Sequence, residues 1–512
     1  MLMRWTRWGF ARRLFAAALL LGPAALLPLR AATRMVSRTR PIHLDPRNPH
    51  YFRFRGHTVA LTGSGEHYGA VLNADFDFRK YLATLSAEGL NYTRIFGGSY
   101  VEVPAKSFGI LRNDLAPQAG RFVAPWARSD VPGYAGSGNK FDLSRWNSEY
   151  FGRYREFLAE ASRRGVIVEI TLFSSQYGEA QWNLSPFNPS NNVNQTSAID
   201  WKKLATLENG NILSFQEQYT RKLVREANGF DNVIFEIQNE PWSDRPALAG
   251  VVNPYLQKPA RDIFPNSIDL ADEMSLIWQS RVAQWITQEE AALPNQHLLA
   301  QNCANFRFPI RELVAGVSIA NFHYAYPEAA LANYGLNKAI AYDETGFLGR
   351  EDEAYRREAW NFLLSGGGAF DALDYSFSPG HEDGSDLEPN GPGGGSPALR
   401  HQLGILQKFL AQFSLADLQP DFHTVRRAPG VAARVLSSRA GEYAVYLDGD
   451  GPLQLTLALP SGQYSAEWFD TRTGAIGGRE AFRHGGGRKT LESPAFRQGI
   501  ALRLRRIVRK AV

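Results

Sequence analysis

The 512-residue sequence predicts a (β/α)8 TIM barrel, which is an α/β fold, followed by a small all-β sandwich domain. Three observations lead to this prediction. Apolar strands alternate with amphipathic helices from residue 59 to about 416, eight such strands can be distinguished, and beyond residue 418 the apolar period changes to two. A doubly wound open sheet is the rival for the first part, but the sequence lacks the glycine-rich turn of dinucleotide-binding sheets.

Each strand of the predicted barrel is a short apolar run bounded by glycines or by a helix pattern. After the first strand, apolar residues recur at helical spacing from Phe78 to Leu85, and Gly89 ends the helix. We place the barrel with an N-terminal hairpin at residues 45–416 and the β-sandwich at residues 418–512. The eight strands are expected at residues 59–65, 91–98, 166–173, 232–240, 297–302, 317–324, 339–345 and 369–377.

The long connections follow the second, third, fourth and eighth strands. They span residues 97–145, 174–210, 241–267 and 378–396. In a barrel of this kind these loops leave the same end, where catalytic sites lie. The last loop contains several acids and a histidine that could suggest a metal, but its glycines and prolines favour a solvated loop at the rim. We therefore expect no metal and no organic cofactor.

Residues 1–32 form a segment apart from the folded domains. Five arginines and no acidic residue accompany a short apolar run and small residues suited to cleavage, which is typical of an export signal, with a twin arginine at Arg12-Arg13. An uncleaved anchor is the alternative, although Pro23 and Pro28 interrupt a run already short for a membrane span. We expect contact with the membrane only during export, and a periplasmic or extracellular location.

The charge and cysteine content narrow the function. Without the five arginines of the signal, 51 basic residues balance 51 acidic ones, so nothing in the charge favours nucleic acid binding. The single cysteine, Cys303, excludes an internal disulfide. Aromatic residues make up 12% of the chain, which suits core packing and equally a cleft in which rings stack on sugars.

Two glutamates end strands that lie across the barrel from each other. Glu240 follows the fourth strand in "VIFEIQNEPW", where Pro241 forbids the strand to continue, and Glu344 closes the seventh strand in "AYDETGF". Cleavage of a glycosidic bond needs two such carboxyl groups, one protonated and one ionised, facing each other across a sugar. The two strand ends therefore predict a glycoside-cleaving site in which Glu344 raises the pKa of Glu240.

The tripeptide Asn239-Glu240-Pro241 on strand four and the glutamate ending strand seven resemble those of clan A glycoside hydrolases, the retaining cellulase-like and mannanase-like barrels. The resemblance covers residues from about 50 to 415 and is specific to the clan, not to a substrate. It implies that Glu240 is the acid/base and Glu344 the nucleophile in the hydrolysis of a β-linked oligo- or polysaccharide or glycoside. Transglycosylation would use the same residues.

The resemblance also implies residues around this pair. Arg94 resembles the arginine beneath the nucleophile, and an interior ion pair with Glu236 or Glu169 is the alternative. Asn239 resembles the asparagine that binds the sugar 2-hydroxyl, and His323 a histidine that contacts substrate.

Other expected contacts are less close to the family pattern. Either Tyr324 or Tyr326 is expected near the nucleophile, since the usual His-x-Tyr spacing is broken here by Ala325. Tyr375 stands where relatives often have a tryptophan under the reacting sugar. His67 and Trp242 are expected to line the cleft.

The C-terminal segment "YSAEWFDTRTG" resembles the β-sandwich attached to some clan members, sometimes labelled collagen-binding. A structural cap on the barrel is favoured over a carbohydrate-binding module. For the whole chain, the alternative to hydrolysis is a non-catalytic carbohydrate-binding or envelope structural protein on a barrel that has lost its activity. The oligomeric state is left open.

Overall fold

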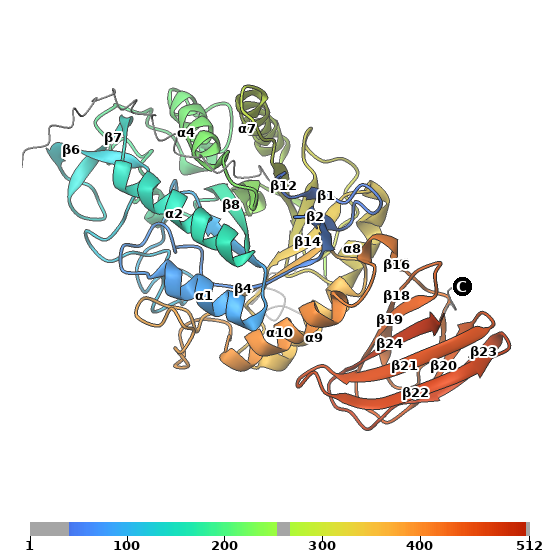
Figure 1. Ribbon diagram of the computed structural model, residues 1–512. Coiled ribbons are helices and arrows are strands. Elements are labelled where there is room, and N and C mark those ends of the chain that lie inside the picture. The colour runs from blue at the N-terminus through green and yellow to red at the C-terminus, as the bar shows by residue number, and fades with distance from the viewer. Residues whose placement is uncertain (1–39, 253–266, 508–512) are drawn as a thin grey trace, which may run out of the picture. The chain divides into compact units, whose positions relative to one another are not determined.

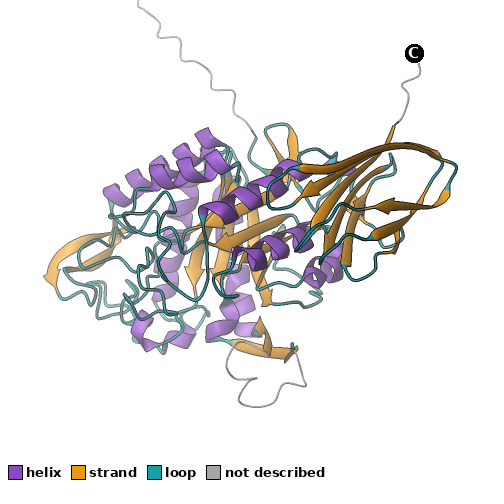
Figure 2. Ribbon diagram, turned by 90° about the horizontal axis from the view of Figure 1, so that it is seen from below, coloured by secondary structure: helices purple, strands orange, loops and turns teal. Residues whose placement is uncertain are grey.

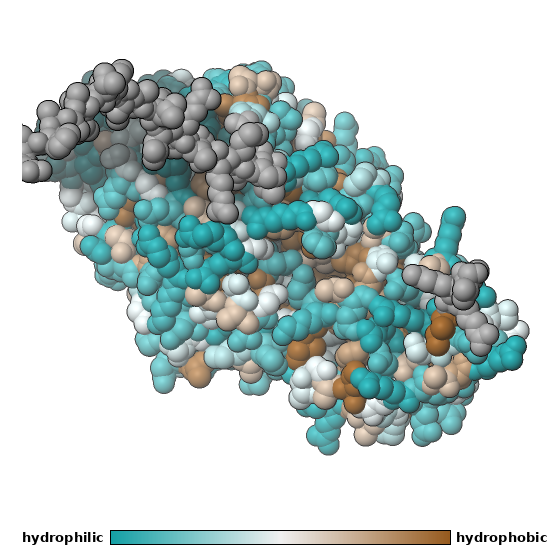
Figure 3. Space-filling model, in the orientation of Figure 1, coloured by the Kyte–Doolittle hydropathy of each residue, from teal (hydrophilic) through white to brown (hydrophobic). Residues whose placement is uncertain are grey.

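A computed structural model describes residues 40–252 and 267–507. The predicted export signal lies outside these residues. No helix within them is long and apolar enough to cross a membrane. On the face seen in Figure 3, hydrophilic side chains predominate and apolar ones are scattered, as on most protein surfaces.

Eight parallel strands close into a barrel, which confirms the predicted fold class (Figure 1). Each strand pairs with the next in chain order, β9 pairs with β12, and β15 pairs with β4 to close the ring. The strands are β4 (Leu61–Gly65), β5 (Tyr92–Phe96), β8 (Ile167–Ser174), β9 (Val233–Asn239), β12 (Leu298–Asn305), β13 (Ile319–His323), β14 (Ala339–Glu344) and β15 (Ala369–Leu373).

Helices follow seven of the eight strands and lie around the barrel (Figure 2). In the described part of the chain, the connection from β12 to β13 contains no helix. The seven are α1 (Phe78–Glu88), α2 (Ser148–Arg164), α4 (Ile212–Ala227), α7 (Glu273–Ala291), α8 (Pro327–Asn333), α9 (Asp352–Leu363) and α10 (Pro397–Leu410).

Capping residues set the ends of these helices. The Asp77 side chain accepts hydrogen bonds from the backbone of Arg79 and Lys80 at the start of α1. Gly89 ends α1 with a φ of +80°, a conformation in which a side chain would be strained. The predicted helix end at Gly89 is therefore correct.

Apolar residues close the end of the barrel at which the strands begin, opposite to the end that carries the long loops. Instead of a simple hairpin, the N-terminal segment forms a three-stranded antiparallel sheet of β1 (His43–Leu44), β2 (Phe52–Phe54) and β3 (His57–Val59). Ile42 and Phe52 from this segment pack against the first residues of the barrel strands, such as Leu61 and Ile234. In the part of the chain that the structure describes, this end of the barrel is therefore filled by an apolar cluster.

Two of the long loops contain hairpins that the sequence pattern did not predict. The loop after β5 carries β6 (Trp126–Pro132) and β7 (Asn139–Trp146). The loop after β9 begins with the short helix α5 (Pro241–Asp244) and continues with β10 (Pro246–Val251) and β11 (Ser267–Ala271). Of the two, the second hairpin contributes Pro246, Ser267 and Asp269 to the wall of the cavity described below.

The C-terminal domain consists of antiparallel strands, as predicted, in a six-stranded and a three-stranded sheet with their own apolar core. Trp360 of α9 stacks on Tyr446 of β19, with ring centroids 5.4 Å apart. The strands are β16 (Gln419–Pro420), β17 (Val425–Arg427), β18 (Ala432–Ser437), β19 (Glu442–Asp448), β20 (Gln454–Leu459), β21 (Gly462–Asp470), β22 (Ile476–His484), β23 (Gly487–Glu492) and β24 (Ile500–Ile507).

Candidate active site

Glu240 leaves its strand through a strained backbone turn. Strand β9 ends at Asn239, Pro241 begins α5, and Glu240 between them has a φ of +43°. Such a left-handed conformation costs a residue with a side chain about 1 kcal/mol or more. Here it is held because the Glu240 N–H donates to Asn302 Oδ1 at 2.9 Å and the Glu240 carbonyl accepts from the Ser175 hydroxyl at 2.6 Å. The turn directs the carboxylate into the mouth of the barrel.

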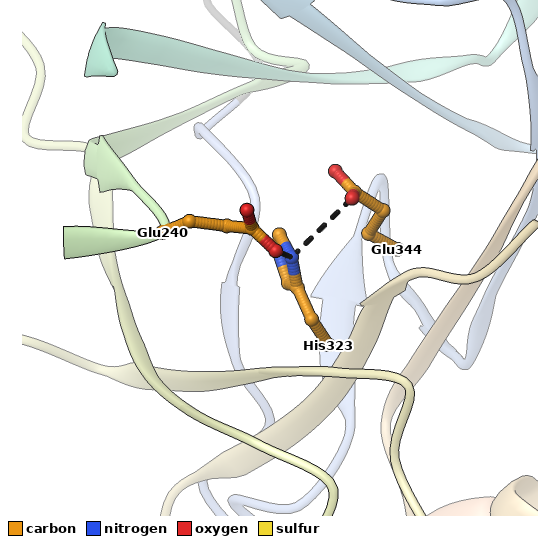
Figure 4. Close-up of side chains that lie close together, drawn as sticks. All are labelled: Glu240, His323 and Glu344. Carbon is orange, nitrogen blue, oxygen red and sulfur yellow. Dashed lines mark hydrogen bonds and ion pairs between the residues drawn. The ribbon is translucent and has the colours of Figure 1, made fainter. Parts of the chain in front are cut away.

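Three side chains from different strands meet at this mouth (Figure 4). One carboxylate oxygen of Glu240, one of Glu344 and a ring nitrogen of His323 lie within 4.8 Å of one another. His323 Nδ1 is 2.8 Å from Glu240 Oε1 and 3.5 Å from Glu344 Oε1. The two predicted catalytic glutamates are therefore neighbours at the end of one barrel.

Tyrosine hydroxyls surround the two carboxylates. Tyr324 donates to Glu344 Oε1 at 2.9 Å and lies 3.3 Å from Glu240 Oε1, so it spans the pair. Tyr68 donates to Glu344 Oε2 at 2.7 Å, and Tyr177 to Glu240 Oε2 at 2.9 Å. Both carboxylates are thus fixed in orientation by hydroxyl donors.

Arg94 connects the mouth to the barrel interior. It is fully buried and donates from Nη1 to Glu344 Oε2 at 3.2 Å and from Nη2 to Asn239 Oδ1 at 2.6 Å. It also donates from Nε and Nη2 to Glu236 Oε2, at 3.0 and 2.5 Å. Arg94 therefore makes both contacts that the sequence left open. It bonds Glu344, and it also forms an interior ion pair, with Glu236 as the partner.

Beneath the mouth lies a second group of acids, formed by Glu169, Glu236 and Asp343. The Asn321 side-chain amide donates to all three, at 2.6, 3.0 and 3.0 Å. Asn302 donates to Glu236 at 2.6 Å. This trio has the spacing of metal ligands, as do Glu240, His323 and Glu344. In both groups oxygens already accept hydrogen bonds from neighbouring side chains, and the expectation of no metal stays a prediction.

The pKa of Glu240 is lowered, whereas the sequence predicted that Glu344 would raise it. Burial acts to raise it, but the hydrogen bond and positive charge of His323 outweigh burial and lower the pKa. The pKa of His323 is in turn raised well above its usual range, because Glu344 and Asp343 overcome the effect of burial. The sequence places Glu344 beside Glu240 but cannot show that His323 lies between them. The proton is therefore held mainly on His323.

Burial also raises the pKa of two interior acids. The pKa of Glu169 rises to about 8 and that of Glu236 to about 7. For Glu169, the charges of Glu236 and Asp343 add to the effect of burial, whereas Arg94 opposes it. Burial and the neighbouring negative charges therefore favour the protonated form of Glu169.

A cavity of about 600 Å³ opens over the two glutamates and is lined by predicted residues. His67 lies in its wall, with Nε2 3.2 Å from both oxygens of Glu102. Trp242 lies in the wall as well, with its ring edge-on to His323 at 5.5 Å.

Two predicted residues lie farther from the glutamates. Tyr326 is 37% exposed and stacks on Phe306, so that of the two tyrosines Tyr324 is the one that contacts Glu344. Tyr375 is buried against His67, with ring centroids 6.2 Å apart, and it lies beyond the end of β15, which stops at Leu373 and not at residue 377. It does not line the cavity.

Sequence reasoning missed four residues of this region. Tyr177 donates to Glu240 and accepts from the Asn239 amide at 2.7 Å. Asn302 and Asn321 donate hydrogen bonds to the interior acids, of which Asp343 is one. The available signal was the polar residues within otherwise apolar strands, such as Asn321 two positions before His323 in "VSIANFHY".

No protein-family model matches the sequence, and no curated protein is significantly similar to it. Solved structures share its fold. A protein described as a glycoside hydrolase has a TM-score of 0.60 and 11% identity, covering 91% of this chain and 97% of its own. A glycoside hydrolase family 5 protein from Bacteroides vulgatus ATCC 8482 has a TM-score of 0.59 and 11% identity, covering 91% and 93%. At this identity the similarity shows a shared fold.

Proposed function

We propose that the chain is a retaining glycoside hydrolase that cleaves a β-linked glycan or glycoside by double displacement. The observation that carries the proposal is the approach of Glu240 and Glu344 to within 4.8 Å between carboxylate oxygens. Carboxyl groups of retaining enzymes lie about 5–5.5 Å apart, whereas inverting enzymes need about 6.5–9.5 Å to admit a water molecule. The shared fold with glycoside hydrolases supports the same function.

In the first step, a Glu344 oxygen attacks the anomeric carbon. Arg94, Tyr68 and Tyr324 donate hydrogen bonds to Glu344, which hold its carboxylate in position for the attack. The glycosidic C–O bond breaks, the glycosyl ester forms, and Glu240 gives a proton to the leaving oxygen. Because His323 Nδ1 lies 2.8 Å from Glu240, it can supply that proton to the carboxylate.

In the second step, water releases the sugar from Glu344. Glu240 accepts a proton from the water, whose oxygen attacks the anomeric carbon as the ester bond breaks. Glu344 leaves as a carboxylate and recovers its hydrogen bonds. A sugar hydroxyl in place of water gives transglycosylation with the same residues. We also propose export of the chain, which rests on the sequence of residues 1–32.

The anomeric configuration of the first product tests the mechanism. A panel of aryl β-glycosides identifies a sugar that the protein cleaves, and proton NMR then follows the product before mutarotation. We expect the β-anomer to appear first. An initial α-anomer would overturn retention, and an absence of turnover on every aryl β-glycoside and β-linked polysaccharide would favour a binding protein instead.

A further inference from the structure

The cleft wall beside Glu240 is apolar beyond the reach of the catalytic pair. Tyr177, which bonds Glu240, packs edge-on against Phe108 with ring centroids 5.1 Å apart. Trp242 and Pro246 line the same cavity. Phe108 is 40% exposed, although burial of such a side chain would be favourable. The surface that these residues form can therefore still accept an apolar group.

The polar groups on this side of the cavity already bond one another. The Ser267 hydroxyl donates to Asp269 Oδ2 at 2.7 Å. Asn305 accepts from the Asp269 N–H at 2.9 Å and donates to the Ser267 carbonyl at 3.0 Å. Each hydroxyl of a buried sugar needs a partner, since an unpaired one costs more than its bond is worth. Among the described residues, these internal bonds occupy donors and acceptors that a second sugar at this wall would need.

The position of Glu240 relates this wall to the leaving group. In the proposed function, Glu240 protonates the oxygen that leaves, so the groups around Glu240 contact whatever that oxygen carries. Farther along β10, whose Pro246 lines the cavity, Leu248 is 68% and Val251 40% exposed. A long apolar substituent would thus remain in contact with the protein after it leaves the cavity.

We propose that the leaving group is a bulky apolar aglycone, a long alkyl or an aryl group, and not a further sugar. This proposal rests on the proposed function, whose substrate it narrows. The sugar that reacts binds over Glu344, and Phe108, Tyr177, Trp242 and Pro246 bind the aglycone.

A series of alkyl β-glycosides from methyl to octyl tests the proposal. Burial of a methylene group changes an equilibrium by up to about fourfold, so half-burial predicts roughly 100-fold higher kcat/KM for octyl than for methyl. Naphthyl glycosides form the aryl arm, and β-linked disaccharides of the same sugar form the competing arm. Equal kcat/KM along the series, or faster cleavage of the disaccharides than of the octyl glycoside, would overturn the proposal.

Substitution of Phe108 locates the aglycone. Phe108 has a φ of +52°, which asparagine tolerates well, so Phe108→Asn removes the ring without new backbone strain. We expect kcat/KM for the octyl glycoside to fall about tenfold more than that for the methyl glycoside. Phe422→Asn, at a 70% exposed phenylalanine of the C-terminal domain, is the matched control and changes neither. An equal loss on both substrates would contradict the assignment.

Binding separates this proposal from the proposed function. Calorimetry on Glu344→Gln, with methyl and octyl glycosides below the micelle concentration of the latter, measures affinity without turnover. Tighter octyl binding is the expected result. If it occurs while the parent protein cleaves no glycoside, the apolar subsite stands and the hydrolase function falls. If the parent protein cleaves glycosides but neither assay shows a preference for octyl, the hydrolase function stands and the apolar subsite falls.

Discussion

Two groups of carboxylates lie in one barrel, and they differ in what surrounds them. At the mouth, Glu240 and Glu344 line a cavity of about 600 Å³ and accept hydrogen bonds from tyrosine hydroxyls. One layer below, Glu169, Glu236 and Asp343 are fully buried and bonded by asparagine amides.

Arg94 is the link between these two layers. Its guanidinium bonds Glu344 above and Glu236 below. A carboxylate in this barrel can therefore either react with substrate or hold Arg94 in place. Which of the two it does depends on whether it lines the cavity. We expect substitutions in the upper layer to remove activity, and those in the lower layer to change its rate or the pH dependence of stability.

The largest effect is expected from Glu344→Gln. The amide cannot form the glycosyl ester, so kcat should fall about 10⁴-fold or more, the scale on which loss of a nucleophile acts. Thermal unfolding should change little, since the shape is kept. Steady-state kinetics on the best aryl glycoside measures the loss. Wild-type turnover by this variant would mean that another residue is the nucleophile and that the upper layer of carboxylates is not the reactive one.

Glu240→Gln should slow hydrolysis by an amount that depends on the leaving group. A poor leaving group needs the proton, so kcat/KM for an alkyl glycoside should fall about 10²- to 10⁴-fold. A dinitrophenyl glycoside needs no acid in the first step, so its kcat/KM should fall far less, and added azide should restore kcat. Equal losses on both substrates would argue that Glu240 orients substrate and is not the acid.

Glu236→Gln tests whether the lower layer of carboxylates positions Arg94. The amide keeps the size of the side chain but removes the charge that holds Arg94, so we expect kcat to fall about 10- to 100-fold with KM nearly unchanged. The pH profile of kcat should shift as well, which loss of stability alone would not produce. Glu290→Gln, at another buried glutamate, serves as the control. Unchanged kcat and pH profile would show that the lower layer does not position Arg94.

The smallest effect is expected from Glu169→Gln, and it concerns stability. The folded protein raises the pKa of Glu169 from 4.5 to about 8, so its stabilising contribution is complete below pH 4.5 and is lost as pH rises through about 8. A glutamine does not titrate. The midpoint of thermal unfolding should therefore decline less steeply between pH 5 and 8 in the variant. Parallel curves for the two proteins would mean that Glu169 is ionised throughout.

The sequence predicts the barrel well because each strand and helix carries its own apolar period. The sequence also locates Glu240 and Glu344, because each stands where a parallel strand ends, and these strand ends meet at one end of the barrel. Adjacent residues of a regular strand point to opposite faces, yet Asp343 and Glu344 both approach Arg94, at 3.6 and 3.2 Å. The pairing of β13 with β14 shifts register at this point. Such a bulge leaves no trace in an apolar period.

The electrostatics of the site were less accessible to prediction than its position. The pKa of Glu240 depends on His323, which is 83 residues away along the chain and 2.8 Å away in space. Likewise, Tyr177 reaches Glu240 from a loop whose path the sequence does not specify. Contacts between strand ends and loops, unlike strand order, are set by tertiary packing.

Trapping of the covalent intermediate tests the central claim most directly. A 2-deoxy-2-fluoro β-glycoside with a dinitrophenyl leaving group should form the ester but release it slowly, because fluorine slows both steps and the leaving group speeds only the first. Mass spectrometry should show one added sugar per chain, on the peptide that contains Glu344. Attachment of the sugar to another residue, or release of dinitrophenol without attachment, would contradict the assignment of Glu344 as nucleophile.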